Sequence, residues 1–196
     1  MQRPERGPLI LPFRGVSPRI HPSVYLAPEC TVTGDVEIGE GSSVWYYVVM
    51  RGDVQRIRIG KRTHVQDLSV VHVTWDTGPT TIGDDVTLGH SCVVHAATIN
   101  DRSLIGMRAV VLDGAEVGPD AIVGAAALVP PGMKVPPGKV AMGVPARIVR
   151  DVTEAERRWI LELGERYAVN TIPGYRDGSA GSAGSAGSAG SGPVRI

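Results

Sequence analysis

Residues 99–124 read INDRSLIGMRAVVLDGAEVGPDAIVG, and an aliphatic residue returns at every sixth position of this stretch. A period of six fits neither a strand, whose side chains alternate with a period of two, nor an α-helix, whose period is 3.6. It is typical of a parallel β-helix, in which each six-residue unit is a short strand plus a turn. The stretch therefore predicts a prism, in which three units close one coil of roughly eighteen residues.

The same period runs through most of the chain and predicts a β-helix over residues 20–150. Glycine often follows the aliphatic marker, and we expect it to permit turn backbone with positive φ. A helical interpretation of residues 20–140 fails on the glycines and prolines. A sandwich would instead show alternation, with turns every 8–12 residues. The markers expected to point into the prism are Ile20, Leu26, Val32, Ile38, Val44, Met50, Ile59, Val65, Val71, Ile82, Leu88, Val94, Ile99, Ile105, Val111, Val117, Val123, Val129 and Val135.

Composition narrows the range of partners. Lys plus Arg and Asp plus Glu both number 20, so the net charge is zero, and we expect neither a nucleic-acid nor a membrane partner. The two cysteines, Cys30 and Cys92, do not make a disulfide framework. No stretch is apolar for long enough to be a signal peptide or a membrane span. We therefore expect a cytoplasmic protein.

A helix is expected after the repeat, within a segment covering residues 151–177. Thr153 followed by Glu156 forms a capping box, because the Thr hydroxyl can accept from the third helical amide and Glu156 can reach back. An apolar stripe at i, i+4 spacing then predicts a helix from about 154 to 168, packed on the outside of the prism. The stripe consists of Ala155, Trp159, Leu163 and Tyr167.

The two ends of the chain depart from the repeat. Residues 1–19 contain four prolines, which predicts an extended lead-in that lies over the body and is anchored by residues 9–11. Residues 178–196 consist mainly of Gly-Ser-Ala triplets, which cannot bury enough surface to offset chain entropy. We expect a flexible linker and short tail there. Its regularity indicates an engineered segment, with a natural low-complexity tail as the alternative.

The repeat is interrupted twice. The spacing of the markers widens to nine residues after Met50 and to eleven after Val71. Residues 51–53 (Arg-Gly-Asp) border the first interruption, and residues 74–79 (TWDTGP) fill the second. Loops that leave a regular scaffold are where functional residues concentrate. His72 lies at the entrance to the second one.

Three of the five histidines, His72, His90 and His95, lie around this second interruption. Three imidazoles with one open position make a hydrolytic zinc site, although each histidine alone could equally be an ordinary surface residue. The phase of the repeat places all three on the outside of the prism, with His90 and His95 on different faces. Both reach one metal only if neighbouring chains contribute, so the pattern favours a closed threefold assembly.

Five short motifs follow one another in order along the chain. They are Arg51-Gly52-Asp53, Val65-Gln66-Asp67, Val71-His72-Val73, Gly89-His90 with His95 five positions later, and Gly143-Val144-Pro145-Ala146. Their combination resembles the γ-class carbonic anhydrases over about residues 10–170. The ordered histidines are the specific part of this resemblance, because hexapeptide acyltransferases share the last motif.

The resemblance implies an architecture and an activity. It implies a left-handed β-helix and a homotrimer with metals at the subunit interfaces, each bound by His72 and His95 of one subunit and His90 of the next. Zn²⁺ is the expected ion, with Fe²⁺ or Co²⁺ as alternatives. The implied reaction is the reversible hydration of carbon dioxide to bicarbonate by a metal-bound hydroxide.

Four further residues receive roles from the same resemblance. Gln66 would orient the hydroxide or the carbon dioxide. Arg51 would join Asp53 and Asp67 in an ion-pair network at the interface, where the pairing could equally serve only to hold the trimer together.

Two positions depart from the family pattern. Val54 stands where active members carry a Glu that helps to move protons, and His64 stands where some members have Asn. We therefore expect low turnover. Two alternatives stay open: a hexapeptide acyltransferase or thioesterase acting on coenzyme A derivatives, and a non-catalytic trimeric scaffold stabilised by metal.

Overall fold

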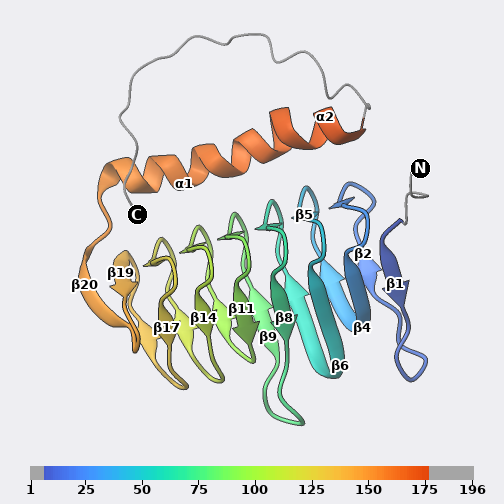
Figure 1. Cartoon of the computed structure of the whole chain (residues 1–196), viewed down its shortest axis with the longest axis horizontal. Coiled ribbons are helices and arrows are strands. Elements are labelled where there is room, and N and C mark those ends of the chain that lie inside the picture. Colours follow the sequence, from blue (N-terminus) through green and yellow to red (C-terminus); the bar gives the residue numbers. More distant parts are fainter. Residues whose placement is uncertain (1–6, 177–196) are drawn as a thin grey trace, which may run out of the picture.

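The six-residue repeat folds into a left-handed parallel β-helix whose coils stack along one axis (Figure 1). This computed structural model describes residues 7–176. The strands of successive coils pair in parallel, as Val94 does with Val71 on one side and Val111 on the other, and only the final pair, β19 with β20, is antiparallel within the described residues. The predicted fold class is confirmed.

The strands form two sheets. The 12-stranded sheet contains β1 (Leu9–Leu11), β2 (Arg19–Ile20), β4 (Thr31–Ile38), β6 (Val49–Ile59), β8 (Val70–His72), β9 (Thr80–Ile82), β11 (Val93–His95), β12 (Thr98–Ile99), β14 (Val110–Val111), β15 (Glu116–Val117), β17 (Leu128–Val129) and β18 (Lys134–Val135). The 8-stranded sheet contains β3 (Tyr25–Leu26), β5 (Ser43–Val44), β7 (His64–Val65), β10 (Thr87–Leu88), β13 (Leu104–Ile105), β16 (Ile122–Val123), β19 (Lys139–Met142) and β20 (Arg147–Asp151).

The aliphatic markers make the core. Every marker from Val32 to Val135 is buried, and the first two, Ile20 and Leu26, are partly buried and pack against the same cluster. Burying one such side chain is worth roughly 1.5–3 kcal/mol. The stack of Val, Ile and Leu therefore stabilises the prism along its length.

The glycines after the markers serve a different purpose from the one expected. Gly39, Gly60 and Gly83 do not have positive φ. A Cβ on Gly60 would instead lie 2.5 Å from the carbonyl oxygen of Gly83 in the next coil. Positive φ occurs at other turn residues, such as Leu68 and Arg108. These glycines are needed because adjacent coils approach too closely for a side chain.

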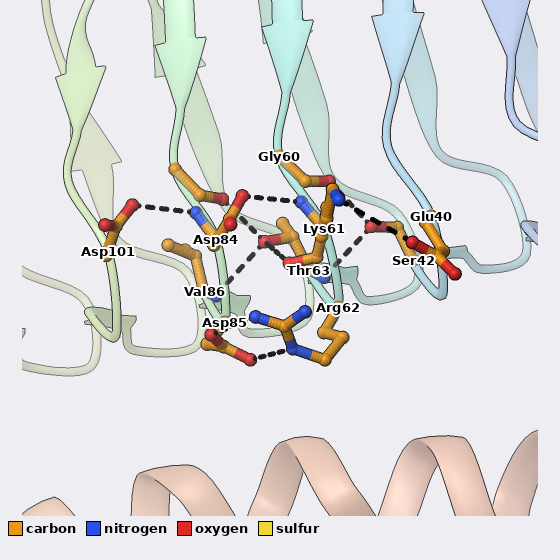
Figure 2. Close-up of polar contacts among 11 residues, drawn as sticks. Glu40, Ser42, Gly60, Lys61, Arg62, Thr63, Asp84, Asp85, Val86 and Asp101 are labelled. Carbon is orange, nitrogen blue, oxygen red and sulfur yellow. Dashed lines mark hydrogen bonds and ion pairs between the residues drawn. The ribbon is translucent and has the colours of Figure 1, made fainter.

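Aspartates hold the coils together at one corner of the prism (Figure 2). The Asp84 carboxylate accepts from the backbone N–H of Lys61 at 2.8 Å, and Asp101 accepts from that of Asp84 at 2.9 Å. Arg62 and Asp85 form an ion pair beside them, at 2.6 Å. Each carboxylate therefore satisfies a turn amide of the preceding coil.

The C-terminal helix lies along the outside of the prism (Figure 1). α1 (Glu154–Arg166) begins with the predicted capping box and continues through a π-helical turn, η1 (Tyr167–Thr171), into α2 (Ile172–Arg176). The helix therefore extends beyond the predicted end at 168. Its contact with the 8-stranded sheet is apolar and comprises Trp159, Ile160 and Leu163 against Leu104, Ile122 and Val140.

One residue of the predicted helical stripe was assigned wrongly. Ala155 is exposed, and Glu156 is buried in its place. The reason is electrostatic: Glu156 accepts from Thr153 and forms an ion pair with Arg150 at 2.7 Å. These contacts hold the pKa of Glu156 at about 2.

The expected anchor of the lead-in also differs from the structure. Residues 9–11 are exposed, and they attach through parallel backbone pairing of β1 with β4 rather than by burying side chains. The predicted tail, residues 178–196, and the first six residues of the lead-in lie outside the described residues. Within residues 7–176, no helix is long and apolar enough to cross a membrane.

Candidate metal centre

The two interruptions of the repeat take different forms. The first is not a loop, because its residues stay within β6, where the pairing with β4 shifts register between Gly34 and Val36. The second leaves the prism as a small hairpin, closed by the bridge between Thr74 and Gly78. His72 ends the strand that leads into this hairpin.

His72 and His95 are neighbours on the 12-stranded sheet. They are register partners at the ends of β8 and β11, and Nδ1 of His72 lies 3.1 Å from Nε2 of His95. A tetrahedral zinc ion with Zn–N distances of about 2.0–2.1 Å holds two ligand nitrogens about 3.3 Å apart. The pair therefore fits two adjacent positions around one metal ion.

An aspartate contacts the other nitrogen of each ring. Oδ1 of Asp53 lies 3.2 Å from Nε2 of His72, and Oδ1 of Asp113 lies 2.6 Å from Nδ1 of His95. A carboxylate accepts from the N–H of a neutral imidazole, which leaves the lone pair on the opposite nitrogen. Both lone pairs then face each other across 3.1 Å, an arrangement that a cation between them would stabilise.

The protonation states suit this arrangement. Burial opposes ionisation of Asp53, but hydrogen bonds from Arg51 and His72 outweigh it and lower the pKa of the carboxyl. A hydrogen bond from the Thr74 hydroxyl is the main cause of a lowered pKa at Asp113. Burial also lowers the pKa of His72, despite the neighbouring Asp53. Ionised carboxylates beside neutral imidazoles are the states that metal binding requires.

His90 lies apart from this pair. It follows β10 of the 8-stranded sheet, it is exposed, and its Nδ1 contacts Oδ2 of Asp67 at 2.8 Å. The expected network of Arg51, Asp53 and Asp67 is therefore split within one chain, where Arg51 pairs with Asp53. Among residues 7–176, no group of three or more His, Cys, Asp or Glu side chains could hold a metal. One chain brings together two of the three predicted ligands.

Gln66 is on the same side of the prism as His90. It follows β7, the strand that pairs with β10, and its Nε2 donates to the hydroxyl of Tyr167 in η1. Gln66 and His90 both line a groove of about 260 Å³ between the sheet and α1. The other side chains of this groove are mostly apolar and include Leu104, Met107, Trp159 and Leu163.

His64 lies beneath the helix, close to Gln66. Its ring stacks on Tyr167 with centroids 4.8 Å apart, and its Nδ1 lies 2.8 Å from Oγ of Ser43. Burial lowers the pKa of His64 to about 4. The side chain therefore serves as a neutral packing surface for Tyr167.

Three contributors to this region were missed by sequence reasoning. Tyr167 was assigned only to the packing stripe of the helix, and nothing local in the sequence connects it with Gln66. Asp113 was not singled out, and Thr74 was named only as part of the segment 74–79. A signal for Asp113 was present, because it lies 18 residues after His95, about one coil along the chain.

Comparison with known proteins places the chain in a family, although no family model matches it. A carbonic anhydrase of Geobacillus kaustophilus is 46% identical over 166 residues, which cover 81% of this chain and 91% of that protein. The mitochondrial gamma carbonic anhydrase 2 of Arabidopsis thaliana is 44% identical, over 77% of this chain and 56% of its own length. A solved putative acetyltransferase of Bacillus cereus superposes with a TM-score of 0.84 at 38% identity, covering 87% of this chain and 98% of that one. This chain therefore belongs to the γ carbonic anhydrase family of hexapeptide-repeat proteins.

Proposed function

We propose that this protein catalyses the reversible hydration of carbon dioxide to bicarbonate, using a divalent metal ion at the interfaces of a homotrimer. His72 and His95 of one subunit and His90 of the next would hold the ion, with Zn²⁺ as first choice and Fe²⁺ or Co²⁺ as alternatives. The observation that carries the proposal is the separation of 3.1 Å between Nδ1 of His72 and Nε2 of His95, with an aspartate behind each ring.

The need for a neighbouring chain follows from ligand number. A catalytic zinc site uses three protein ligands and keeps one position open. His72 and His95 supply two nitrogens, and His90, on the other sheet, has its Nδ1 engaged by Asp67. Its Nε2 is then suited to complete the site of an adjacent subunit in a closed ring. A metal ion held there would supply Lewis acidity and lower the pKa of bound water to about 7.

Other residues of the chain would orient the substrate and support the metal ligands. The amide of Gln66, held by Tyr167, would orient the substrate beside His90. The apolar side chains of the adjoining groove suit an uncharged molecule such as carbon dioxide. Arg51 neutralises Asp53, which in turn holds His72, so this ion pair would support the metal side of the interface.

Proton release is expected to be the weak step. Val54 has a hydrocarbon side chain, which cannot accept a proton. It is partly buried and packs against the core. The proton released on forming bicarbonate would pass directly to solution buffer. We therefore expect low turnover that rises with buffer concentration and with pH.

The acyltransferase alternative is supported by the name of the solved Bacillus cereus relative, a putative acetyltransferase that shares the fold at 38% identity. A scaffold stabilised by metal would use the same histidines without turnover. Three histidines, each beside a carboxylate, exceed the single catalytic histidine that an acyltransferase ordinarily needs. They favour metal binding over acyl transfer.

The test combines metal analysis with stopped-flow carbon dioxide hydration on protein purified without chelators. We expect about one metal ion per chain and buffer-dependent hydration in the parent. The variant His72→Ala should lose both, while His21→Ala, which alters an exposed histidine of the first coil, should retain both. Equal hydration by the parent and His72→Ala would reject the proposal. If the parent binds metal but does not hydrate carbon dioxide, the result would favour the non-catalytic scaffold stabilised by metal.

A further inference from the structure

We propose that Asp113 is a positioning residue that fixes the tautomer and orientation of His95, and that Thr74 holds Asp113 in place. This inference rests on the proposed function, because it concerns a ligand of the proposed metal site. It adds a part of the site that lies one coil beyond the last histidine.

Each carboxylate oxygen of Asp113 contacts a different side chain. Its Oδ1 lies 2.6 Å from Nδ1 of His95, a short distance for a hydrogen bond between N–H and oxygen. Its Oδ2 accepts from the hydroxyl of Thr74. With both oxygens engaged, the carboxylate has little freedom to rotate. It therefore presents a fixed acceptor to one nitrogen of the imidazole.

Thr74 is itself held by the hairpin that follows His72. Its backbone N–H donates to the Gly78 carbonyl at 2.8 Å, and the return bond measures 3.3 Å. A Cβ on Gly78 would lie 2.7 Å from Cβ of Thr74 and 2.8 Å from Cβ of Ala96, the residue after His95. The hairpin therefore packs tightly beside both histidines. Through the hydrogen bond from Thr74 to Asp113, the hairpin links the strand of His72 to the coil that supplies Asp113.

The chemical consequence concerns which nitrogen of His95 carries the proton. In a neutral imidazole either nitrogen can carry it, and the hydrogen-bond partner decides. A carboxylate at Nδ1 keeps the proton there, so Nε2 retains its lone pair and faces Nδ1 of His72. Removing Asp113 would allow the proton to occupy Nε2, which then could not bind a metal.

A purely structural role is the competing explanation. The turn aspartates Asp84 and Asp101 accept from backbone amides of the preceding coil, as Asp101 does from Asp84 (Figure 2). Asp113 differs because its carboxylate oxygens contact the side chains of His95 and Thr74. Asp101 is therefore a matched control: it is a turn aspartate of a neighbouring coil that does not contact a histidine.

The experiment uses the full chain with ¹⁵N-labelled histidine, first without metal and then titrated with Zn²⁺ against a chelator. In the parent and in Asp101→Ala, NMR should show His95 as the Nδ1–H tautomer. In Asp113→Ala we expect a mixture of tautomers and a zinc affinity about 10- to 100-fold weaker. Asp113→Asn keeps a neutral acceptor, so it should preserve the tautomer and lose less affinity. Thr74→Val should weaken zinc binding by a few-fold.

An unchanged His95 tautomer in Asp113→Ala would overturn the inference, and so would an equal affinity loss in Asp101→Ala. If Asp113→Ala fails to fold, Asp113→Asn and Thr74→Val decide the matter, and parental zinc affinity in both would overturn the inference. The two proposals can also fail separately. If the parent binds no zinc, but His95 loses its Nδ1–H tautomer in Asp113→Ala, the proposed function is rejected and the link between Asp113 and His95 is supported.

Discussion

The two halves of the proposed site are built in different ways. The half with His72 and His95 lies on the 12-stranded sheet and is rich in charge, since Asp53 and Asp113 each contact one imidazole. The half with Gln66 and His90 lies on the 8-stranded sheet, under a helix and next to an apolar groove. Within one chain, these halves occupy different sides of the prism.

This difference suggests a division of labour between neighbouring subunits. Carboxylates behind imidazoles strengthen metal binding and set ring orientation. An amide held by a tyrosine, beside apolar side chains, suits the orientation of a small uncharged substrate. The subunit that supplies most of the metal ligands would therefore differ from the one that orients the substrate. Variants in the half with His72 and His95 should therefore lose metal, whereas variants of Gln66 should lose turnover and keep the metal.

Replacing Gln66 tests the substrate-orienting half. We expect Gln66→Ala to lower turnover by roughly 100-fold, because the oriented amide is lost, while the metal content stays unchanged. Gln55→Ala is the matched control, because the Gln55 amide donates to the backbone carbonyl of Asp76 and accepts from the backbone N–H of Arg56. Stopped-flow rates and metal analysis on the same samples provide the comparison. Loss of metal from Gln66→Ala would show that the two halves are not separable.

At His64, which supports Tyr167 in the same half, the expected effect is on stability and not on turnover. Its pKa of about 4 lies below the ordinary value of 6.5, so between these values the unfolded chain binds a proton that the folded chain does not. The free energy of unfolding should therefore be highest above pH 6.5 and fall by about 3 kcal/mol as the pH drops to 4.

Denaturant unfolding of the metal-free protein at several pH values measures this decline. His64→Asn should flatten the pH dependence in that window, even if its stability at neutral pH is lower. His21→Asn, at an exposed histidine, should leave the decline as in the parent. If the free energy of unfolding of His64→Asn declines with falling pH as steeply as that of the parent, the decline is due to other titratable groups.

The architecture was readily predicted because the repeat is redundant. The six-residue period occurs so often that single errors do not change the fold, and the inward phase of Val71 and Val94 correctly placed His72 and His95 outside. The same phase shows which residues face outward but not how they approach one another. The tight contact between Gly60 and Gly83 therefore became visible only in the structure.

The supporting residues of the site were hidden for a related reason. The hydrogen bond between Gln66 and Tyr167 spans 101 positions and depends on how the C-terminal helix lies along the prism. Hydrophobic periodicity predicts that such a helix packs on the prism, but not which hydroxyl meets which amide. Asp113 is two residues past Val111, whereas His95 is one residue past the register partner of Val111, so strand register alone does not place Asp113 beside His95.

A site shared between subunits is the central claim, and mixed trimers test it most directly. His72→Ala and His90→Ala chains, co-expressed with different tags, can be isolated together by two successive purifications. In a closed ring, each mixed trimer contains one interface where His72 and His95 of one chain meet an intact His90 of its neighbour. We predict about one third of the parental metal content and carbon dioxide hydration in mixed trimers, and neither in trimers of one variant alone. Mixed trimers as empty and inactive as the single variants, or full metal content in His90→Ala alone, would contradict the shared site.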